Sequence, residues 1–395
     1  MEPVIFHIDV NSAFLSWTAI EQLKNGSTVD LRTIPSIIGG DRESRHGIVL
    51  AKSTSAKTFG IKTGEPVAHA LRKCESLVIA RPDHAMYRQY SKQLMTLLRT
   101  FTPDIEQLSI DECFLDFTPI AYQYESPIAG ATLISKTVKE QLGFTVNIGI
   151  APNKLLAKMA SDFEKPDRIH TLWKEEIPKK LWPLRTVFRA VGRSLGITTI
   201  GELAHTDKDF LMREFKSHGL LMWEYANGIA PAEVHSTVEK LKGVGNSTTL
   251  AQDVSNADDA KKVLLALAEQ VSSRLRKSNQ LAQSVTVEIK YSTFQRTSHQ
   301  KVLLFPTNST QPIYELSCRL FDELWNHSPI RLLGIRTGKL LDEDAPVQMT
   351  LFDSGYLEAK SEKQQKLDAA LDQIKSRYGE NAVIRGSFFP EKEEP

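Results

Sequence analysis

Three carboxylates at two places in the chain could hold catalytic metal ions. Asp9 ends a short apolar run near the N-terminus, and Asp111 and Glu112 stand side by side about a hundred residues later. Mg²⁺ prefers oxygen ligands and usually takes only one or two protein carboxylates, while substrate phosphates complete its coordination. In-line phosphoryl transfer benefits from two such ions roughly 3.5–4 Å apart, and three converging acids suit that chemistry.

Each acid taken alone has an ordinary explanation. An Asp at a strand end is usually a turn or cap residue, and an Asp-Glu pair is usually solvated. Asp111 and Glu112, however, lie inside the apolar segment 108–117, where an uncompensated charge is costly. Neighbouring residues of a regular strand point to opposite faces, so both acids can serve one metal pair only if the backbone turns or bulges there.

A set of strands and helices must position these acids. Hydrophobic periodicity and turn residues predict strands over 4–10, within 34–50, over 107–117 as a strand–turn–strand, and over 145–150, with helices over 12–24, 87–101, 129–142 and 153–163. Such a mixture favours an α+β unit. A more helical region is expected over 181–230, followed by a third unit with a helix over 257–277 and a strand over 284–291, a linker over 342–354 and a polar helix over 357–378.

Composition limits the class of protein. The 395 residues suggest two to four domains, and a net charge of +1 means that a nucleic-acid partner requires unevenly placed charge. The third unit is expected to carry a basic face made of Arg274, Arg276, Lys277, Lys290, Arg296, Lys301, Arg331, Arg336 and Lys339. Three scattered cysteines without a C-x-x-C pair argue against a disulfide framework and a zinc site. No signal-peptide pattern and no long apolar run is recognised, so no membrane association is expected.

Three motifs in the right order and spacing resemble the Y-family translesion DNA polymerases. They are residues 9–14 (DVNSAF), 109–112 (SIDE) and 149–166 (GIAPNKLLAKMASDFEKP), and the likeness extends over about 4–341. The most similar branch is the bacterial UmuC/ImpB/MucB type, including UvrX-like proteins. The resemblance implies an α+β, multidomain right-hand polymerase. Its parts would be a ferredoxin-like palm over 1–12 and 75–170, small fingers over 13–74, a helical thumb over 171–238, an α/β little finger over 239–341 and a tail over 342–395.

The same resemblance implies roles for the acids. Asp9 and Asp111 would ligate both of two Mg²⁺ ions, and Glu112 would ligate the ion that activates the primer 3′-hydroxyl. The backbone carbonyl of Val10 would complete the ion on the nucleotide side.

The nucleotide pocket is expected to involve four further residues. Spacing alone makes Phe14 an ordinary core aromatic on a helix; the resemblance makes it the steric gate that rejects a 2′-hydroxyl. Thr54, Lys57 and Lys165 would contact the nucleotide, with the lysines as point charges for the triphosphate. Many members of the family carry Tyr and Arg at positions 54 and 57, so this chain departs from the pattern there.

Two regions suggest how DNA and a partner are held. The helix–hairpin–helix of the thumb has Ala190 in place of its first Gly, and its following helix is shortened after Arg193. In the tail, Gln348, Leu351 and Phe352 form a Q-x-x-L-F peptide that looks like a bacterial sliding-clamp binding peptide. A local hydrophobic contact of the tail is the ordinary alternative.

The expected function is template-directed, low-fidelity DNA synthesis from dNTPs on primer–template DNA, as used for translesion synthesis in DNA repair, the SOS response and mutagenesis. No separate exonuclease acid cluster is recognised, so proofreading is not expected. The protein would act as a monomer in the cytoplasm, associated with the nucleoid. Two alternatives are a nucleotidyl cyclase, which also pairs carboxylates with two metals, and a non-enzymatic damage-response factor that binds DNA and the clamp.

Overall fold

The computed structural model describes residues 2–40, 47–183, 195–237, 240–345, 355–379 and 382–383 of the chain. The chain divides into two compact units, Met1–Val238 and Glu239–Pro395. The second unit therefore begins where the little finger was expected. Each unit is described by itself.

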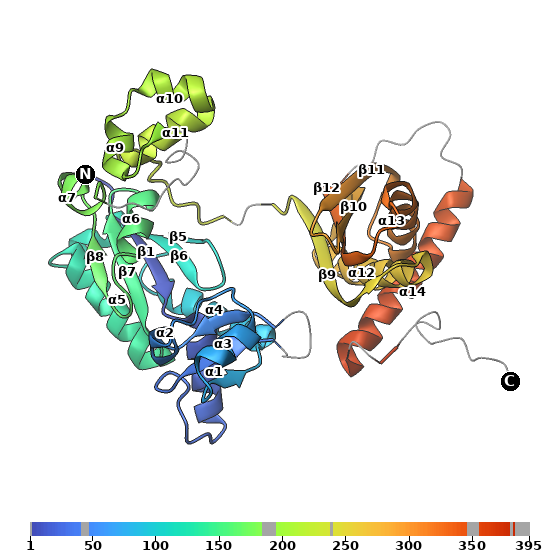
Figure 1. Ribbon diagram of the computed structural model, residues 1–395, viewed down its shortest axis with the longest axis horizontal. Helices are drawn as coiled ribbons and strands as arrows, with labels where there is room; N and C mark the ends of the chain where they lie inside the picture. The colour runs from blue at the N-terminus through green and yellow to red at the C-terminus, as the bar shows by residue number, and fades with distance from the viewer. Residues whose placement is uncertain are drawn as a thin grey trace. The chain divides into compact units, whose positions relative to one another are not determined.

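A five-stranded sheet forms the centre of the first unit, in the order β5-β6-β1-β7-β8 (Figure 1). The strands are β1 (Ile5–Val10), β5 (Ile105–Gln107), β6 (Glu112–Asp116), β7 (Val146–Ala151) and β8 (Ile169–Thr171). β1 runs antiparallel to both of its neighbours, β6 and β7. The strand that carries Asp9 is thus the middle strand of the sheet.

The two faces of β1 have different coverings. Phe6 and Ile8 face a core shared with α1 (Ala13–Lys24), α4 (His84–Leu98) and α5 (Pro127–Leu142). Ile5 belongs to the core on the other face, which contains Leu156 and Ala157 of α6 (Lys154–Ser161). Because side chains alternate along a strand, His7 and Asp9 lie on the α6 face.

Helix α6 comes unusually close to the sheet at Gly149 of β7. A Cβ atom at this position would lie 1.9 Å from the carbonyl oxygen of Ala157 and 2.5 Å from the amide nitrogen of Ser161. Only glycine allows this approach, which sets the height of α6 above His7, the register partner of Gly149 on β1.

A second, three-stranded sheet follows the order β3-β2-β4. It consists of β2 (Ser36–Gly39), β3 (Val49–Lys52) and β4 (Val78–Ala80), with α2 (Thr54–Thr58) and α3 (Val67–Lys73). β4 pairs in parallel with β2, so residues 78–80 belong to this second sheet. A strand of three residues is too short to show periodicity, and its partner lies about forty residues away in the chain, so no local pattern predicts the pairing.

The rest of the first unit is helical. It contains η1 (Thr118–Gln123), η2 (Lys174–Glu176), α7 (Ile177–Lys180), α9 (Ile200–His205), α10 (Lys208–Phe215) and α11 (Ser217–Ala226). Leu181, Leu203 and Leu211 pack with Leu156 of α6 in one core, so this helical part is joined to the α6 face of the sheet. The expected helix–hairpin–helix, with Ala190 and Arg193, lies outside the described residues.

The second unit is a four-stranded antiparallel sheet with helices. Its strand order is β11-β10-β12-β9, and its strands are β9 (Gly243–Val254), β10 (Gln280–Tyr291), β11 (Arg296–Thr307) and β12 (Ile330–Asp342). α12 (Ala257–Lys277) and α13 (Thr310–Leu324) pack on it around Leu264, Val287 and Phe321. The bounds of α12 agree with the predicted helix.

Helix α14 (Gly355–Tyr378) is fastened to this second unit by charged groups. Arg276 of α12 contacts Asp372 at 2.6 Å and Asp368 at 3.6 Å, and Asp368 accepts the backbone N–H of Thr310 at 3.1 Å. Arg276 was expected on a basic face, but it serves this internal contact. Arg296 and Lys301 likewise form ion pairs, with Glu288 and Glu323.

In the described parts of both units, no helix combines the length and apolar character needed to cross a bilayer.

Candidate active site

The three expected acids lie at one end of the two central strands of the five-stranded sheet. Asp9 and Glu112 are register partners across β1 and β6, so their side chains start on the same face. Asp111 immediately precedes β6, and its carbonyl accepts the N–H of Val10 at 3.0 Å. The fold therefore brings together positions that are about a hundred residues apart in sequence.

The backbone bends before β6, as the hypothesis required. Residues 109–111 form this bend and the strand begins only at Glu112, whose carbonyl accepts the N–H groups of Leu108 and Ser109 at 3.1 and 3.2 Å. The hydroxyl of Ser109 donates to Oδ1 of Asp111 at 2.6 Å and holds that carboxylate. Asp111 is consequently free of the strict alternation that would place it on the opposite face from Glu112.

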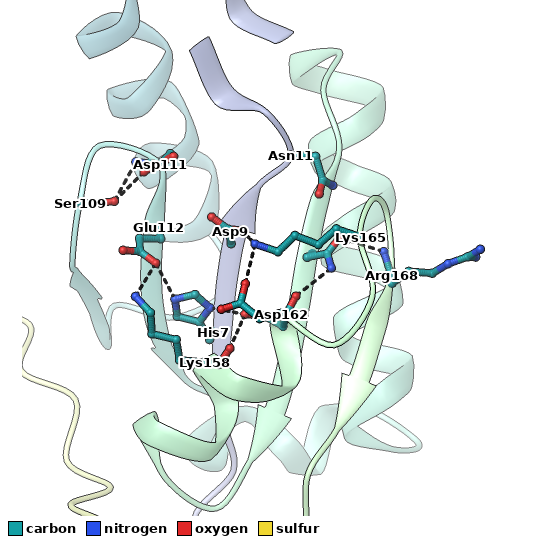
Figure 2. A network of polar contacts seen from close by, with 12 residues as sticks. His7, Asp9, Asn11, Ser109, Asp111, Glu112, Lys158, Asp162, Lys165 and Arg168 are labelled. Carbon is teal, nitrogen blue, oxygen red and sulfur yellow. Dashed lines mark hydrogen bonds and ion pairs between the residues drawn. The ribbon is translucent and has the colours of Figure 1, made fainter. Parts of the chain in front are cut away.

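Asp9 is partnered by a lysine. Lys165 contacts Asp9 and also lies 2.7 Å from Oδ1 of Asp162, so one ammonium group bridges two carboxylates (Figure 2). Burial raises the pKa of Asp9 above its ordinary value, and the charges of Asp111 and Glu112 raise it further, against the opposing effect of Lys165. The repulsion among the three acids shows that they share one electrostatic site.

Glu112 points away from Asp9 toward α6. Its Oε2 lies 2.8 Å from Nζ of Lys158 and 3.1 Å from Nε2 of His7, whose Nδ1 lies 2.7 Å from the hydroxyl of Ser161 (Figure 2). Burial by itself would raise the pKa of Glu112, but Lys158 and His7 outweigh it and hold the pKa below its ordinary value.

His7 is neutral in this setting. Burial lowers its pKa to about 4, although Glu112 acts in the opposite direction. A neutral imidazole has one N–H, which it can donate to Glu112 from Nε2 or to the hydroxyl of Ser161 from Nδ1. The hydroxyl of Ser161 itself donates to the carbonyl of Lys158 at 2.8 Å. Sequence reasoning missed His7, Lys158 and Asp162. The signals available were the two-residue spacing from His7 to Asp9 and the helical four-residue spacing from Lys158 to Asp162.

The donor set has the chemistry that Mg²⁺ requires, since it consists of carboxylate oxygens and the carbonyl of Val10. In the described ranges, however, no three acidic, histidine or cysteine side chains are gathered closely enough to hold a metal ion. Figure 2 shows that Asp9 and Glu112 are each in contact with a lysine ammonium group, that of Lys165 and that of Lys158.

A cleft of about 460 Å³ opens beside Asp9. Seven positions predicted to bind metal or nucleotide line it. They are Asp9, Val10, Phe14, Thr54, Lys57, Asp111 and Lys165. Its lining residues are Asp9, Val10, Asn11, Ser12, Ala13, Phe14, Leu50, Ala51, Lys52, Ser53, Thr54, Lys57, Thr63, Asp111, Lys165 and Pro166. The expected nucleotide-binding residues thus line one cavity.

Phe14 lines this cleft, and its ring is supported by packing against a second aromatic ring. Its ring stacks on Tyr87 of α4, with centroids 4.4 Å apart and planes 8° from parallel. The hydroxyl of Tyr87 lies 3.0 Å from that of Thr18, so the supporting ring is itself held. Phe14 is half-buried and packs against the main core, in agreement with the core position predicted from spacing. Its remaining surface lines the cleft and is accessible to a ligand.

The expected clamp peptide, with Gln348, Leu351 and Phe352, lies between β12 and α14 and outside the described residues.

Comparison with known proteins gives consistent results along the whole chain. The impB/mucB/samB family matches residues 8–162, and the C-terminal domain of the same family matches residues 241–351. A DNA polymerase IV of Clostridium acetobutylicum is 46% identical over 100% of both chains. A DNA polymerase IV of Alkaliphilus oremlandii is 36% identical over 98% of this chain and 99% of its own. DNA polymerase IV 1 of Bacillus subtilis is 34% identical over 99% and 94%.

A solved structure has the same fold. The Y-family DNA polymerase chimera Dbh-Dpo4-Dbh superposes with a TM-score of 0.73 over 86% of this chain and 99% of its own, at 21% sequence identity. Full-length relatives named as polymerases decide against a cyclase and against a purely DNA-binding factor. The chain belongs to the Y family of DNA polymerases, and it is a template-directed DNA polymerase of the low-fidelity, translesion kind.

Proposed function

We propose that this polymerase transfers nucleotides at a two-metal centre made by Asp9, Asp111 and Glu112 with the carbonyl of Val10. The observation that carries the proposal is the pairing of Asp9 with Glu112 across β1 and β6, with Asp111 in the bend beside them. Two Mg²⁺ ions bound there would supply Lewis acidity at the attacking and leaving oxygens of an in-line displacement. The acids' oxygen-only donor set supports this choice of metal.

The lysines beside the acids would hold phosphate and position a carboxylate. Lys165 contacts Asp9 and lines the cleft, so it can turn from the carboxylate to a phosphate without leaving the site. Lys158 and neutral His7 hold Glu112 from the α6 side and fix the position of its carboxylate. These contacts offset the negative charges of Asp9 and Glu112 when no metal ion or nucleotide is bound.

Phe14, Thr54 and Lys57 would bind the incoming dNTP. Phe14 would lie under the sugar as the steric gate, and its stacking on Tyr87 supports this role because a rigid ring resists displacement by a 2′-hydroxyl. Thr54 and Lys57 of α2 line the same cleft. Lys57 and Lys165 would contact the triphosphate as point charges.

The tail would tether the enzyme to the bacterial sliding clamp through Gln348, Leu351 and Phe352. Two large apolar side chains next to an acidic stretch, after the last strand of the second unit, support docking into a partner's groove. Tethering would raise the effective concentration of the polymerase at a primer end. The protein would otherwise act as a monomer in the cytoplasm, close to the nucleoid.

Primer extension tests the centre. The full chain is assayed with Mg²⁺ on intact and damaged templates, alongside Glu112→Ala and Glu140→Ala. Glu140 is an exposed acid of α5 with a weak helical ion pair, which makes it a matched control. We expect extension by the wild type and Glu140→Ala and a loss of at least about 100-fold in Glu112→Ala. Glu112→Ala with wild-type rates would refute the assignment of the centre.

A further inference from the structure

Lys52, the last residue of β3, is a lysine of the cleft to which no role has yet been given. It lines the cavity together with Lys57, Asp9 and Phe14. Its side chain is half-buried, whereas Lys57 is exposed. Two cations therefore line the same cavity as Asp9 and Asp111.

The backbone at Lys52 is tied to the strand that carries Asp9. Ser12, in the turn that follows β1, donates its hydroxyl to the carbonyl of Lys52 at 3.2 Å. Ser12 adopts a left-handed conformation, with φ 49°, which is uncommon for a residue with a side chain. This contact joins the second sheet to the turn next to the acids and fixes where Lys52 enters the cleft.

Among the described residues, no acid lies within ion-pair distance of Lys52. The charge of Glu65 raises the pKa of Lys52, but Glu65 is already paired with Lys73 at 2.5 Å. Within the ranges that the structure describes, no ion pair joins Lys52 or Lys57 to a carboxylate. Burial lowers the pKa of Lys52, and the charges of Lys57, Lys73 and Lys62 lower it further.

A half-buried ammonium group beside a second one is unfavourable unless an anion neutralises them. The other lysines at this site, Lys158 and Lys165, each have a carboxylate partner. Lys52 and Lys57 differ from them because no carboxylate of the described ranges pairs with either, so their ammonium groups can donate to an anion in the cavity. A multiply charged oxyanion matches both the charge and the donors.

We propose that Lys52 is a phosphate-binding residue which, with Lys57, receives the polyphosphate tail of the incoming nucleotide. The inference rests on the proposed role of the cleft as the dNTP site. A backbone phosphate of DNA has the same chemistry, but the nucleotide is favoured because the cavity also contains Phe14 and the acids. Lys52 thereby sets nucleotide affinity and takes no part in the chemical step.

Single-nucleotide insertion by the full chain tests this role with Lys52→Ala, Lys52→Arg and Lys62→Ala. Lys62 is an exposed lysine near Lys52 that does not line the cleft, so it controls for the loss of one positive charge. We expect Lys52→Ala to raise KM for dNTP about tenfold with kcat within about twofold, because a contact equal in ground and transition states changes KM alone. Lys52→Arg should restore most of the affinity, and Lys62→Ala should behave as wild type.

Two binding measurements identify the ligand. Inorganic tripolyphosphate, as a competitor without sugar or base, should lose inhibition in Lys52→Ala by the same factor as KM rises. The affinity for labelled primer–template DNA, measured by fluorescence anisotropy without nucleotide, should not change.

A normal KM in Lys52→Ala, or a weaker hold on DNA in its place, would overturn the inference while leaving the polymerase site intact. If Glu112→Ala kept full activity, the proposed centre would fail instead, so the two failures are distinguishable. The thermal unfolding temperature of Lys52→Ala should match that of the wild type. If it does not, KM for dNTP is measured for Lys52→Gln, which nearly keeps the length of the side chain, and the same rise in KM is expected.

Discussion

Gly149→Ala should separate α6 from the sheet and disturb the acids through it. The new Cβ would lie 1.9 Å from the carbonyl oxygen of Ala157, and real Cβ contacts are practically never shorter than 3.0 Å, so helix and strand must part by about 1.1 Å. Both clashing atoms are backbone, so no rotamer change can relieve the contact. Overpacking of this kind destabilises by about 3 kcal/mol, which corresponds to roughly 6–12 °C in Tm for a unit of this size.

The displacement also has a catalytic consequence. α6 carries Lys158 and Ser161, which hold Glu112 and His7 at 2.8 and 2.7 Å. A shift of about an ångström breaks hydrogen bonds of this length, so kcat should fall by about 100-fold even where the protein is fully folded.

Calorimetry and primer extension at a temperature well below the transition measure the two effects. Gly26→Ala is the control, because Gly26 has a φ of 91° but no atom within 4 Å of the added Cβ. It should show the mild loss of a strained backbone, about 1 kcal/mol, with normal kcat. A Gly149→Ala protein with unchanged Tm and kcat would show that α6 does not position the acids.

Three further predictions address the gate, pH and the tail. Phe14→Ala should reduce the discrimination against ribonucleotides by about 100-fold, measured as the ratio of kcat/KM for dNTP and rNTP; unchanged selectivity would reject the gate. His7 binds its proton in the folded state only near pH 4 but in the unfolded state near 6.5, so the free energy of unfolding should fall as pH drops through that window, and His7→Gln should flatten this slope in urea titrations. The triple change Gln348→Ala, Leu351→Ala and Phe352→Ala should weaken binding to the clamp by about tenfold or more in surface plasmon resonance; undiminished binding would remove the peptide from consideration.

The sequence predicted best those helices and strands whose apolar residues recur with a regular spacing. Strand β1 and helices α1 and α12 were predicted because apolar periodicity marks them directly. The bend at Asp111 was predicted for a different reason, since two adjacent acids can converge only if the strand is interrupted.

Other features depend on which segments meet, and a single sequence does not contain that information. β4 joins β2 through a pairing that no local pattern signals. His7 and Lys158 act on Glu112 because β1, β6 and α6 bring them to one place, so their roles follow from register and helix height. The pairing of residues 78–80 with β2 was therefore not predicted, whereas the expected acids do lie together at one end of β1 and β6.

The lysines near the acids also affect the long-range electrostatic field around the cleft. Four carboxylates and four ammonium groups share this part of the molecule, namely Asp9, Asp111, Glu112 and Asp162 with Lys52, Lys57, Lys158 and Lys165. Such a balanced set has little far-reaching field, in keeping with the net charge of +1 of the whole chain. Nucleotides should accordingly arrive by unassisted diffusion, with an association rate that depends only weakly on ionic strength, and selection should begin only when the phosphates reach the separated charges inside.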